Sequence, residues 1–241
     1  MTKLDNYSEV WRTKPVLRAV YNSLYQKIAA HVCPGPTLEI GSGIGNLNLP
    51  ENKITRLDIQ ASDEVDIVGD AHAIPFDDNT FDNIILFDVL HHLDCPLIFL
   101  AEAHRVLKLG GRIIMVEPAI TPLSYPFYHL LHEERVDMSW IPDPQCIPNL
   151  TKDPYDSNQA IPTLLFGKYK NSFGPKLGLP FTIKIKEYLS LFVYPFSGGF
   201  KRWNLIPALL VKPLLKIDDI LASFIGRVFG FRLLVVLEKK N

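Results

Sequence analysis

The chain has 241 residues, of which 47% are hydrophobic and 21% charged, a composition that is typical of a folded globular protein and excludes a disordered one. Its formal net charge of −1 argues against nucleic-acid binding, which usually requires a basic excess. The charge is uneven, because residues 201–241 hold eight Lys or Arg and three Asp or Glu, which gives that segment +5 and leaves −6 for the rest.

The three cysteines, Cys33, Cys95 and Cys146, form no CxxC pair and are odd in number. Neither a disulfide framework nor a zinc site is therefore expected, and a reducing, cytoplasmic compartment fits best. The N-terminus carries charges where a signal peptide needs its apolar core. No uncharged apolar run reaches the roughly 18 residues of a membrane-spanning helix.

Residues 1–34 are predicted to form an N-terminal helical segment, because apolar residues recur at helical spacing over 8–32. The strand Thr37–Ile40 follows and runs into a turn with glycines at positions 41, 43 and 45. Glycine has no Cβ, so a ligand can approach the backbone N–H groups of such a turn closely.

Two features separate this turn from the dinucleotide fingerprint G-x-G-x-x-G. Asn46 stands where the fingerprint needs glycine, and the acid Glu39 precedes the turn. A carboxylate there repels a pyrophosphate and suits an ammonium or sulfonium ligand. A nicotinamide oxidoreductase is therefore disfavoured.

The pattern acid-x-G-x-G-x-G, here Glu39, Gly41, Gly43 and Gly45, resembles the first motif of the class I S-adenosylmethionine-dependent methyltransferases, in particular those of methyltransferase type 11. Further segments continue the resemblance to about residue 120. It implies a single α/β domain over residues 1–241, with a Rossmann-like sheet that is mostly parallel and has an antiparallel last strand. It also implies S-adenosyl-L-methionine as cofactor.

The first crossover departs from this pattern. Only about ten residues, including Pro50, separate Gly45 from the next strand at 55–59, so the crossover helix is expected to be a single turn or absent. Asp58 and Ile59 end that strand. Asp58 has the spacing of an acid that accepts hydrogen bonds from ribose hydroxyls, although a turn or capping role is the alternative.

Further cofactor contacts are expected at the carboxyl ends of the next two strands. The third strand ends at Asp70 and Ala71, which the resemblance implies as the contacts to adenine. The apolar run 84–87 is typical of a central parallel strand, and it places Phe87 and Asp88 at the same edge.

The candidate catalytic residues are His91, His92 and Glu117. A neutral imidazole can accept a proton near pH 7, so one histidine could be a general base or a substrate contact. Neighbouring histidines on a helix point in different directions, so at most one is expected to face the site. Glu117 could contact substrate or be a structural acid at a strand end.

A helix is predicted over 97–109, with Gly110 and Gly111 as its C-cap and a strand at 112–117 after it. Residues 119–161 then lose clear periodicity among many prolines and aromatics, which favours an inserted substrate lid. His129, His132 and Glu133 lack the order HExxH and a further ligand, so no metal site is predicted there.

Residues 201–230 form an apolar, basic segment that is predicted to be helical. It could rest on an anionic membrane, at the inner face, or consist of two core helices between the last strands. The resulting hypothesis is methyl transfer from S-adenosylmethionine to a small acceptor of hydrophobic or lipid-like character. The alternative is a non-catalytic cofactor-binding module or membrane-associated scaffold. The sequence indicates no oligomeric state.

Overall fold

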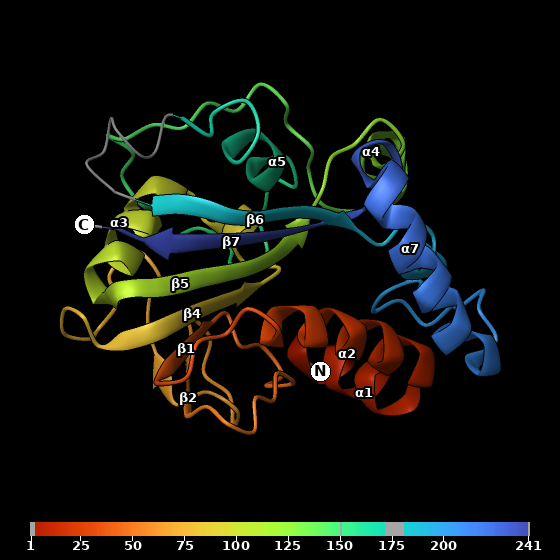
Figure 1. Cartoon of the computed structure of the whole chain (residues 1–241), viewed down its shortest axis with the longest axis horizontal. Coiled ribbons are helices and arrows are strands. Elements are labelled where there is room, and N and C mark those ends of the chain that lie inside the picture. Colours follow the sequence, from red (N-terminus) through yellow and green to blue (C-terminus); the bar gives the residue numbers. More distant parts are fainter. Residues whose placement is uncertain (1–2, 150, 172–180, 241) are drawn as a thin grey trace.

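The computed structural model describes residues 3–149, 151–171 and 181–240 (Figure 1). Its described strands form one seven-stranded sheet in the order β3-β2-β1-β4-β5-β7-β6. The strands are β1 (Thr37–Ile40), β2 (Ile54–Asp58), β3 (Ile67–Val68), β4 (Phe81–Phe87), β5 (Leu107–Pro118), β6 (Phe181–Leu189) and β7 (Arg232–Lys239).

Strands β1 to β5 run parallel, whereas β7 is antiparallel to both of its neighbours, β5 and β6. The last strand is thus the one that reverses direction. This confirms the predicted α/β sheet, which is mostly parallel with an antiparallel last strand. Because β1 to β5 are parallel, their carboxyl ends meet at one edge, where ligands of such sheets bind.

Helices cover both faces of the sheet (Figure 1). One face packs on α3 (Pro96–Val106) and α5 (Ile161–Leu165), and the other packs on α2 (Pro15–Ala29), α6 (Val193–Ser197) and α7 (Val211–Phe229). The remaining elements are α1 (Lys3–Thr13), η1 (Leu90–His92), α4 (Ser124–Leu131) and η2 (Ala208–Leu210). None of the helices in the described part of the chain is long and apolar enough to cross a bilayer.

The N-terminal segment contains two helices where the sequence predicted one. Lys14 is extended, with φ −112° and ψ 91°, and Pro15 begins the second helix at its first position. Proline fits that position because its ring fixes φ near the helical value and its missing N–H needs no partner there.

Residues 41–53, all of them described, contain no helix, which confirms the predicted loss of the first crossover helix. Leu47 and Leu49 are buried instead and join the core beneath α2. The backbone of the glycine turn therefore lacks a following helix whose dipole would favour an anion.

The predicted C-cap at Gly110 and Gly111 is wrong. Helix α3 ends at Val106, and Leu107 already pairs with Phe81 of β4. The pairing then jumps to Arg112, so the glycines lie at a register shift within β5 and not at the end of a helix. Leu107 is fully buried in the core, and this burial overrides the local capping signal of the glycines.

Candidate functional site

The glycine turn lies at the carboxyl end of β1 and is held by Asp58 at the end of β2. Gly41, Gly43 and Gly45 have φ values of 68°, 53° and 65°, a region that favours glycine. One carboxylate oxygen of Asp58 accepts a hydrogen bond from Gly43 N at 2.9 Å, and the other accepts one from Gln60 N at 2.9 Å. Asp58 therefore fixes the turn and keeps lone pairs for a ligand.

Two observations indicate that the turn has room and polar groups for a ligand. A Cβ added to Gly43 would meet no atom within 4 Å. The hydroxyl of Ser42 is buried and has no hydrogen-bond partner among the described residues. An open backbone beside an unpartnered hydroxyl fits the close approach of a ligand such as S-adenosylmethionine.

Glu39 lies beneath the turn and is buried. Its carboxylate is 3.2 Å from Nε of Arg56, which in turn donates to Leu47 O at 3.0 Å. Burial raises the pKa of Glu39 to about 7, against the opposing effect of Arg56. The charge of Glu39 is thus partly compensated within the chain, and its contact with a cationic ligand stays a prediction.

The predicted contacts of β2 and β3 lie on the same edge. The Ile59 side chain is 55% exposed directly after Asp58, and Ala71 is buried. Asp70 accepts hydrogen bonds from the backbone N–H of His72 at 2.9 Å and meets its ring nitrogen at 2.8 Å. The contacts of these residues with adenosine stay predictions.

Phe87 ends β4 in an aromatic cluster with α2. Its ring centroid lies 5.1 Å from that of Tyr21 and 5.2 Å from that of Tyr25. Asp88 follows with a positive φ of 58° and forms an ion pair with Arg232 of β7. The partly buried charge of Asp88 therefore already has a partner, which favours a structural role for it.

Sequence reasoning missed Arg232. Its side chain is 2% exposed, and its guanidinium lies 4.1 Å from the ring centroid of Tyr194. A lone basic residue in the apolar run 231–237 was the available signal. A charge at such a position is seldom buried without a partner of opposite charge.

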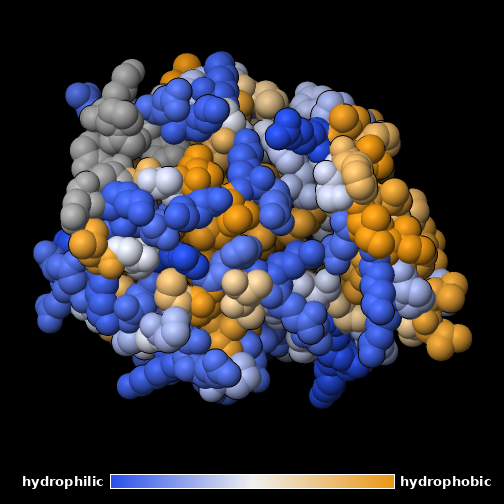
Figure 2. All heavy atoms as spheres, in the orientation of Figure 1, coloured by the Kyte–Doolittle hydropathy of each residue, from blue (hydrophilic) through white to orange (hydrophobic). Residues whose placement is uncertain are grey.

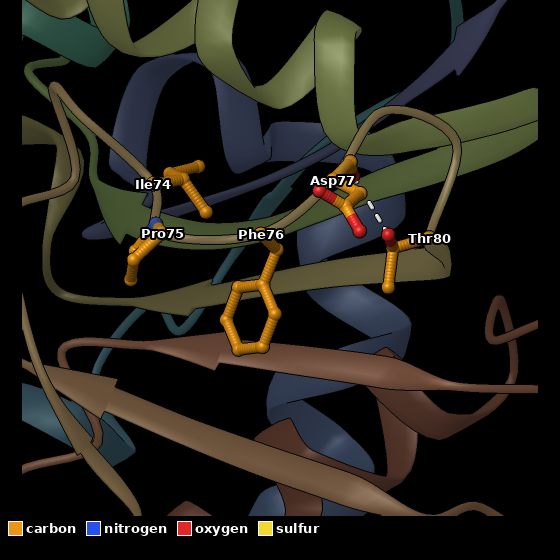
Figure 3. A pocket seen from close by; sticks show the side chains of 5 residues that line it. All are labelled: Ile74, Pro75, Phe76, Asp77 and Thr80. Carbon is orange, nitrogen blue, oxygen red and sulfur yellow. Dashed lines mark hydrogen bonds between the residues drawn. The ribbon is translucent and has the colours of Figure 1, made fainter.

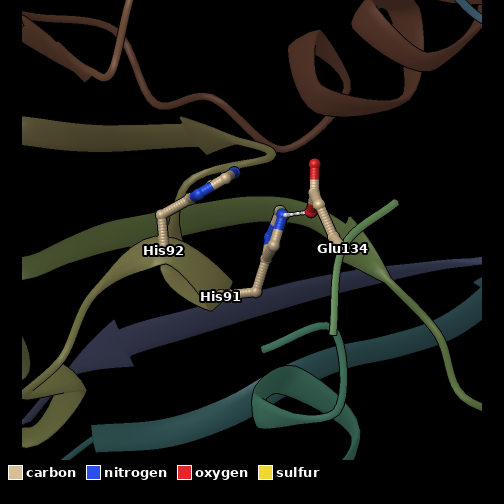
Figure 4. A group of neighbouring side chains, drawn as sticks. All are labelled: His91, His92 and Glu134. Carbon is tan, nitrogen blue, oxygen red and sulfur yellow. Dashed lines mark ion pairs between the residues drawn. The ribbon is translucent and has the colours of Figure 1, made fainter. Parts of the chain in front are cut away.

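Glu117, at the end of β5, is fully buried and holds η1. One of its oxygens accepts hydrogen bonds from the backbone N–H groups of Val89 and Leu90 at 3.0 and 2.8 Å. The other oxygen lies 2.7 Å from Nδ1 of His91. The other ring nitrogen of His91 lies 3.4 Å from the carboxylate of Glu134 (Figure 4). His91 therefore bridges two carboxylates.

Burial alone would lower the pKa of His91, but its hydrogen bonds to Glu117 and Glu134 outweigh that effect and raise the pKa to about 9. His91 is then an imidazolium at neutral pH, which favours a bridging role over that of general base. Burial and the charge on His91 lower the pKa of His92 to about 4. His92 is therefore the neutral imidazole of the pair.

Both histidines face the same group, and the expectation that they point in different directions is wrong. They lie on a 3₁₀ turn, their ring centroids are 4.2 Å apart, and one ring nitrogen from each lies within 4.8 Å of a Glu134 oxygen (Figure 4). These donor types can bind divalent metals, but both ring nitrogens of His91 already face carboxylates. His129 and His132 belong to no such group among the residues described.

The described residues of 119–161 fold back over this edge, and they bring Glu134 beside His91. Sequence reasoning missed Glu134. Asn158 N donates to His91 O at 2.9 Å, and Lys152 Nζ donates to His92 O at 2.7 Å. Farther along the edge, the Tyr155 hydroxyl lies 3.1 Å from Oε1 of Gln60, beside Asp58. The segment thus spans from the end of β2 to η1.

The prediction of no disulfide is wrong, because Cys95 and Cys146 are joined. Cys95 precedes α3 and Cys146 belongs to residues 119–161, so the bond ties that segment beside η1. The argument for a reducing compartment rested partly on unpaired cysteines and loses that support. The two residues are 51 positions apart, and only the fold brings them together.

A shallow depression lined by Ile74, Pro75, Phe76, Asp77 and Thr80 lies elsewhere (Figure 3). Thr80 immediately precedes β4, so the depression is at the amino end of that strand. It is therefore opposite the edge that carries the predicted site residues.

Residues 38–115 match the family model described as "Methyltransferase domain". An uncharacterised protein of Methanocaldococcus jannaschii is 31% identical over 126 residues, which are 48% of this chain and 60% of that protein. A demethylmenaquinone methyltransferase of Staphylococcus epidermidis is 31% identical over 136 residues, which are 51% of this chain and 56% of that protein. The chain thus spans little more than half the length of these curated relatives.

A solved structure from Thermotoga maritima, of an S-adenosylmethionine-dependent methyltransferase described as a possible histamine N-methyltransferase, has the same fold. Its TM-score is 0.55 at 18% identity, over 97% of this chain and 96% of that one. Such a low identity supports the fold alone. The matched segment contains the glycine turn, Asp58 and the η1 histidines, so this part of the chain is similar to methyltransferase domains, and the chain shares the fold of the solved methyltransferase.

Proposed function

We propose that this protein transfers a methyl group from S-adenosylmethionine to a small, hydrophobic acceptor. The observation that carries the proposal is the glycine turn held by Asp58, with its open side at Gly43 and the unpartnered hydroxyl of Ser42. This turn lies at the sheet edge where η1 and residues 119–161 meet. The methionine, ribose and adenine contacts are assigned to the predicted cofactor residues on that edge.

The cofactor supplies a methyl group activated by the positive charge of its sulfonium. The protein then has to align the acceptor and exclude water, so proximity and desolvation contribute most of the effect. Tyr155, Asn158 and Lys152 hold the covering segment against the edge and limit the access of water. These contacts support the assignment of residues 119–161 as a substrate lid.

An acceptor that must lose a proton needs a base, and His92 is the residue we assign to it. Its imidazole is neutral at physiological pH because burial and the neighbouring His91 lower its pKa to about 4. Such a base is weak, so the proposal favours acceptors that are already nucleophilic, such as an electron-rich carbon. His91 and Glu117 are assigned to position η1.

The acceptor class is supported by one relative. The protein from Staphylococcus epidermidis is named for demethylmenaquinone, a quinone. We propose an apolar acceptor of comparable character for this chain. We also propose that residues 201–230 bring the protein to a membrane surface, at the cytoplasmic face that the sequence predicts.

The second candidate is a non-catalytic cofactor-binding module. Two observations favour it: no helix follows β1, and both ring nitrogens of His91 already face carboxylates. Both reduce the number of groups at this edge that could take part in a reaction. Calorimetry with S-adenosylmethionine and its demethylated product separates these proposals from a chain that binds neither. Labelled cofactor should then transfer its methyl group to a lipid fraction of cell extract, and binding without transfer to any fraction would favour the module.

A further inference from the structure

Half of the exposed large apolar side chains of the described residues belong to one stretch. Of 22 such side chains, 11 lie between Trp203 and Phe229, and four more lie between Leu123 and Leu131. Leu123 N donates to Val228 O at 3.1 Å, so the start of α4 joins the end of α7. Figure 2 shows apolar side chains gathered along the side of the molecule where these helices lie.

Helix α7 packs on the core through Val211, Leu214 and Leu215, and it also buries an acid on this inner face. Asp218 points inward and is 2% exposed. Its carboxylate accepts hydrogen bonds from the backbone N–H groups of residues 191, 192 and 193 at 2.9, 2.9 and 3.1 Å. Gly226 lies on the same inner face, where an added Cβ would come within 2.9 Å of Tyr188 O. These contacts fix the rotation of the helix, so its outer face cannot turn into the core.

The outer face is apolar. Ile217, Ile220, Phe224 and Val228 recur three or four residues apart and therefore form one stripe along the helix. All four are exposed, Phe224 to 81%. Together with Leu130 and Leu131 of α4, which are 74% and 66% exposed, they define what we call the α4–α7 surface.

A basic stripe borders this surface on one side. Lys212, Lys216 and Arg227 lie between the inner and outer faces of α7, as the 100° step per residue requires. All three are exposed, and none forms an ion pair with another residue of the described chain. The acids of the same helix are engaged, since Asp218 caps backbone N–H groups and Asp219 pairs with Lys27 at 3.0 Å.

We propose that the α4–α7 surface docks on an anionic lipid bilayer, with the apolar stripe in the interface and the basic stripe at the headgroups. Unpaired lysine and arginine next to apolar side chains complement anionic headgroups. A second copy of the chain bound at this surface would present the same basic residues, and it would offer no unpaired acid of α7 to neutralise their charge. Helix α4 ends three residues before Glu134, so the surface leads to the edge of the site.

The link between this surface and the edge of the site rests on the proposed function, whereas docking on a bilayer can be measured without it. The wild-type protein should float with vesicles of phosphatidylcholine and phosphatidylglycerol and float much less with phosphatidylcholine alone. Phe224→Glu should lower the fraction bound by about tenfold or more, since it puts a charge into the interface. Ile147→Glu is the matched control, because Ile147 is 86% exposed but lies outside the surface.

A thermal melt shows whether each variant is folded, and it keeps the docking test separate from the function. Loss of flotation in Phe224→Glu with an unchanged melting temperature supports the proposal. Wild type that stays unbound, or equal loss in both variants, overturns it. Light scattering tests whether a second copy of the chain binds the surface instead. If the wild type is a dimer that Phe224→Glu dissociates, and if it does not bind vesicles, the surface is a dimer interface and the bilayer proposal is wrong.

Discussion

Replacing Asp58 by alanine should weaken S-adenosylmethionine binding by one to two orders of magnitude. The carboxylate holds Gly43 N and Gln60 N at 2.9 Å each and is assigned to the ribose hydroxyls. Losing a charge-assisted hydrogen-bond pair to the ligand costs about 1.5–3 kcal/mol, which corresponds to about 10-fold to 150-fold in the dissociation constant. Asp58→Asn keeps the size and one acceptor, so it should lose about half of that free energy.

The assay is isothermal calorimetry with the cofactor, preceded by a thermal melt to establish that the variant is folded. Asp66→Ala is the matched control, because Asp66 also accepts a backbone N–H, from Arg56 at 2.8 Å, but from an exposed position away from the glycine turn. The reasoning is refuted if Asp58→Ala binds as tightly as the wild type, or if Asp66→Ala loses as much affinity as Asp58→Ala.

Three further outcomes are expected. Gly43→Ala should weaken cofactor binding by about tenfold or more. Gly110 also has a positive φ, 77° against 53° for Gly43, and open space around it, so Gly110→Ala should leave the affinity unchanged; equal losses would place the ligand elsewhere. Because the pKa of Glu39 is raised to about 7, the cationic cofactor should bind up to about tenfold tighter near pH 8 than near pH 6, and Glu39→Gln should abolish that dependence. Reducing the bond between Cys95 and Cys146, which closes a loop of 51 residues, should lower the free energy of unfolding by about 4 kcal/mol in a denaturant titration; an unchanged midpoint would contradict this.

Local patterns predicted the cofactor half of the fold. The strands that end at Ile40, Asp58 and Phe87 were readable because an apolar run followed by a turn is a short-range signal. The missing crossover helix was readable from Pro50 and the short spacing. Each of these inferences needs only neighbouring residues.

The features that sequence reasoning missed depend on contacts between distant residues. Glu134 reaches His91 only because the chain after β5 folds back, and Arg232 of β7 reaches Asp88 at the end of β4 past the intervening strand β5. Gly111 was misread for a related reason, since burial in the sheet outweighed a local capping signal. Where one partner comes from an aperiodic segment, periodicity carries no information about the pairing.

The anchoring of residues 119–161 also bears on the rate of turnover. Near the C-terminal end of the segment, Tyr155 contacts the edge beside β2 and Asn158 contacts it beside η1, and the disulfide of Cys146 shortens the part that is free to move. Entry and exit of a nucleoside-sized ligand then require the Tyr155 contact to open while the bonded end acts as the hinge. We expect departure of the demethylated product, and not the methyl-transfer step, to limit the steady-state rate.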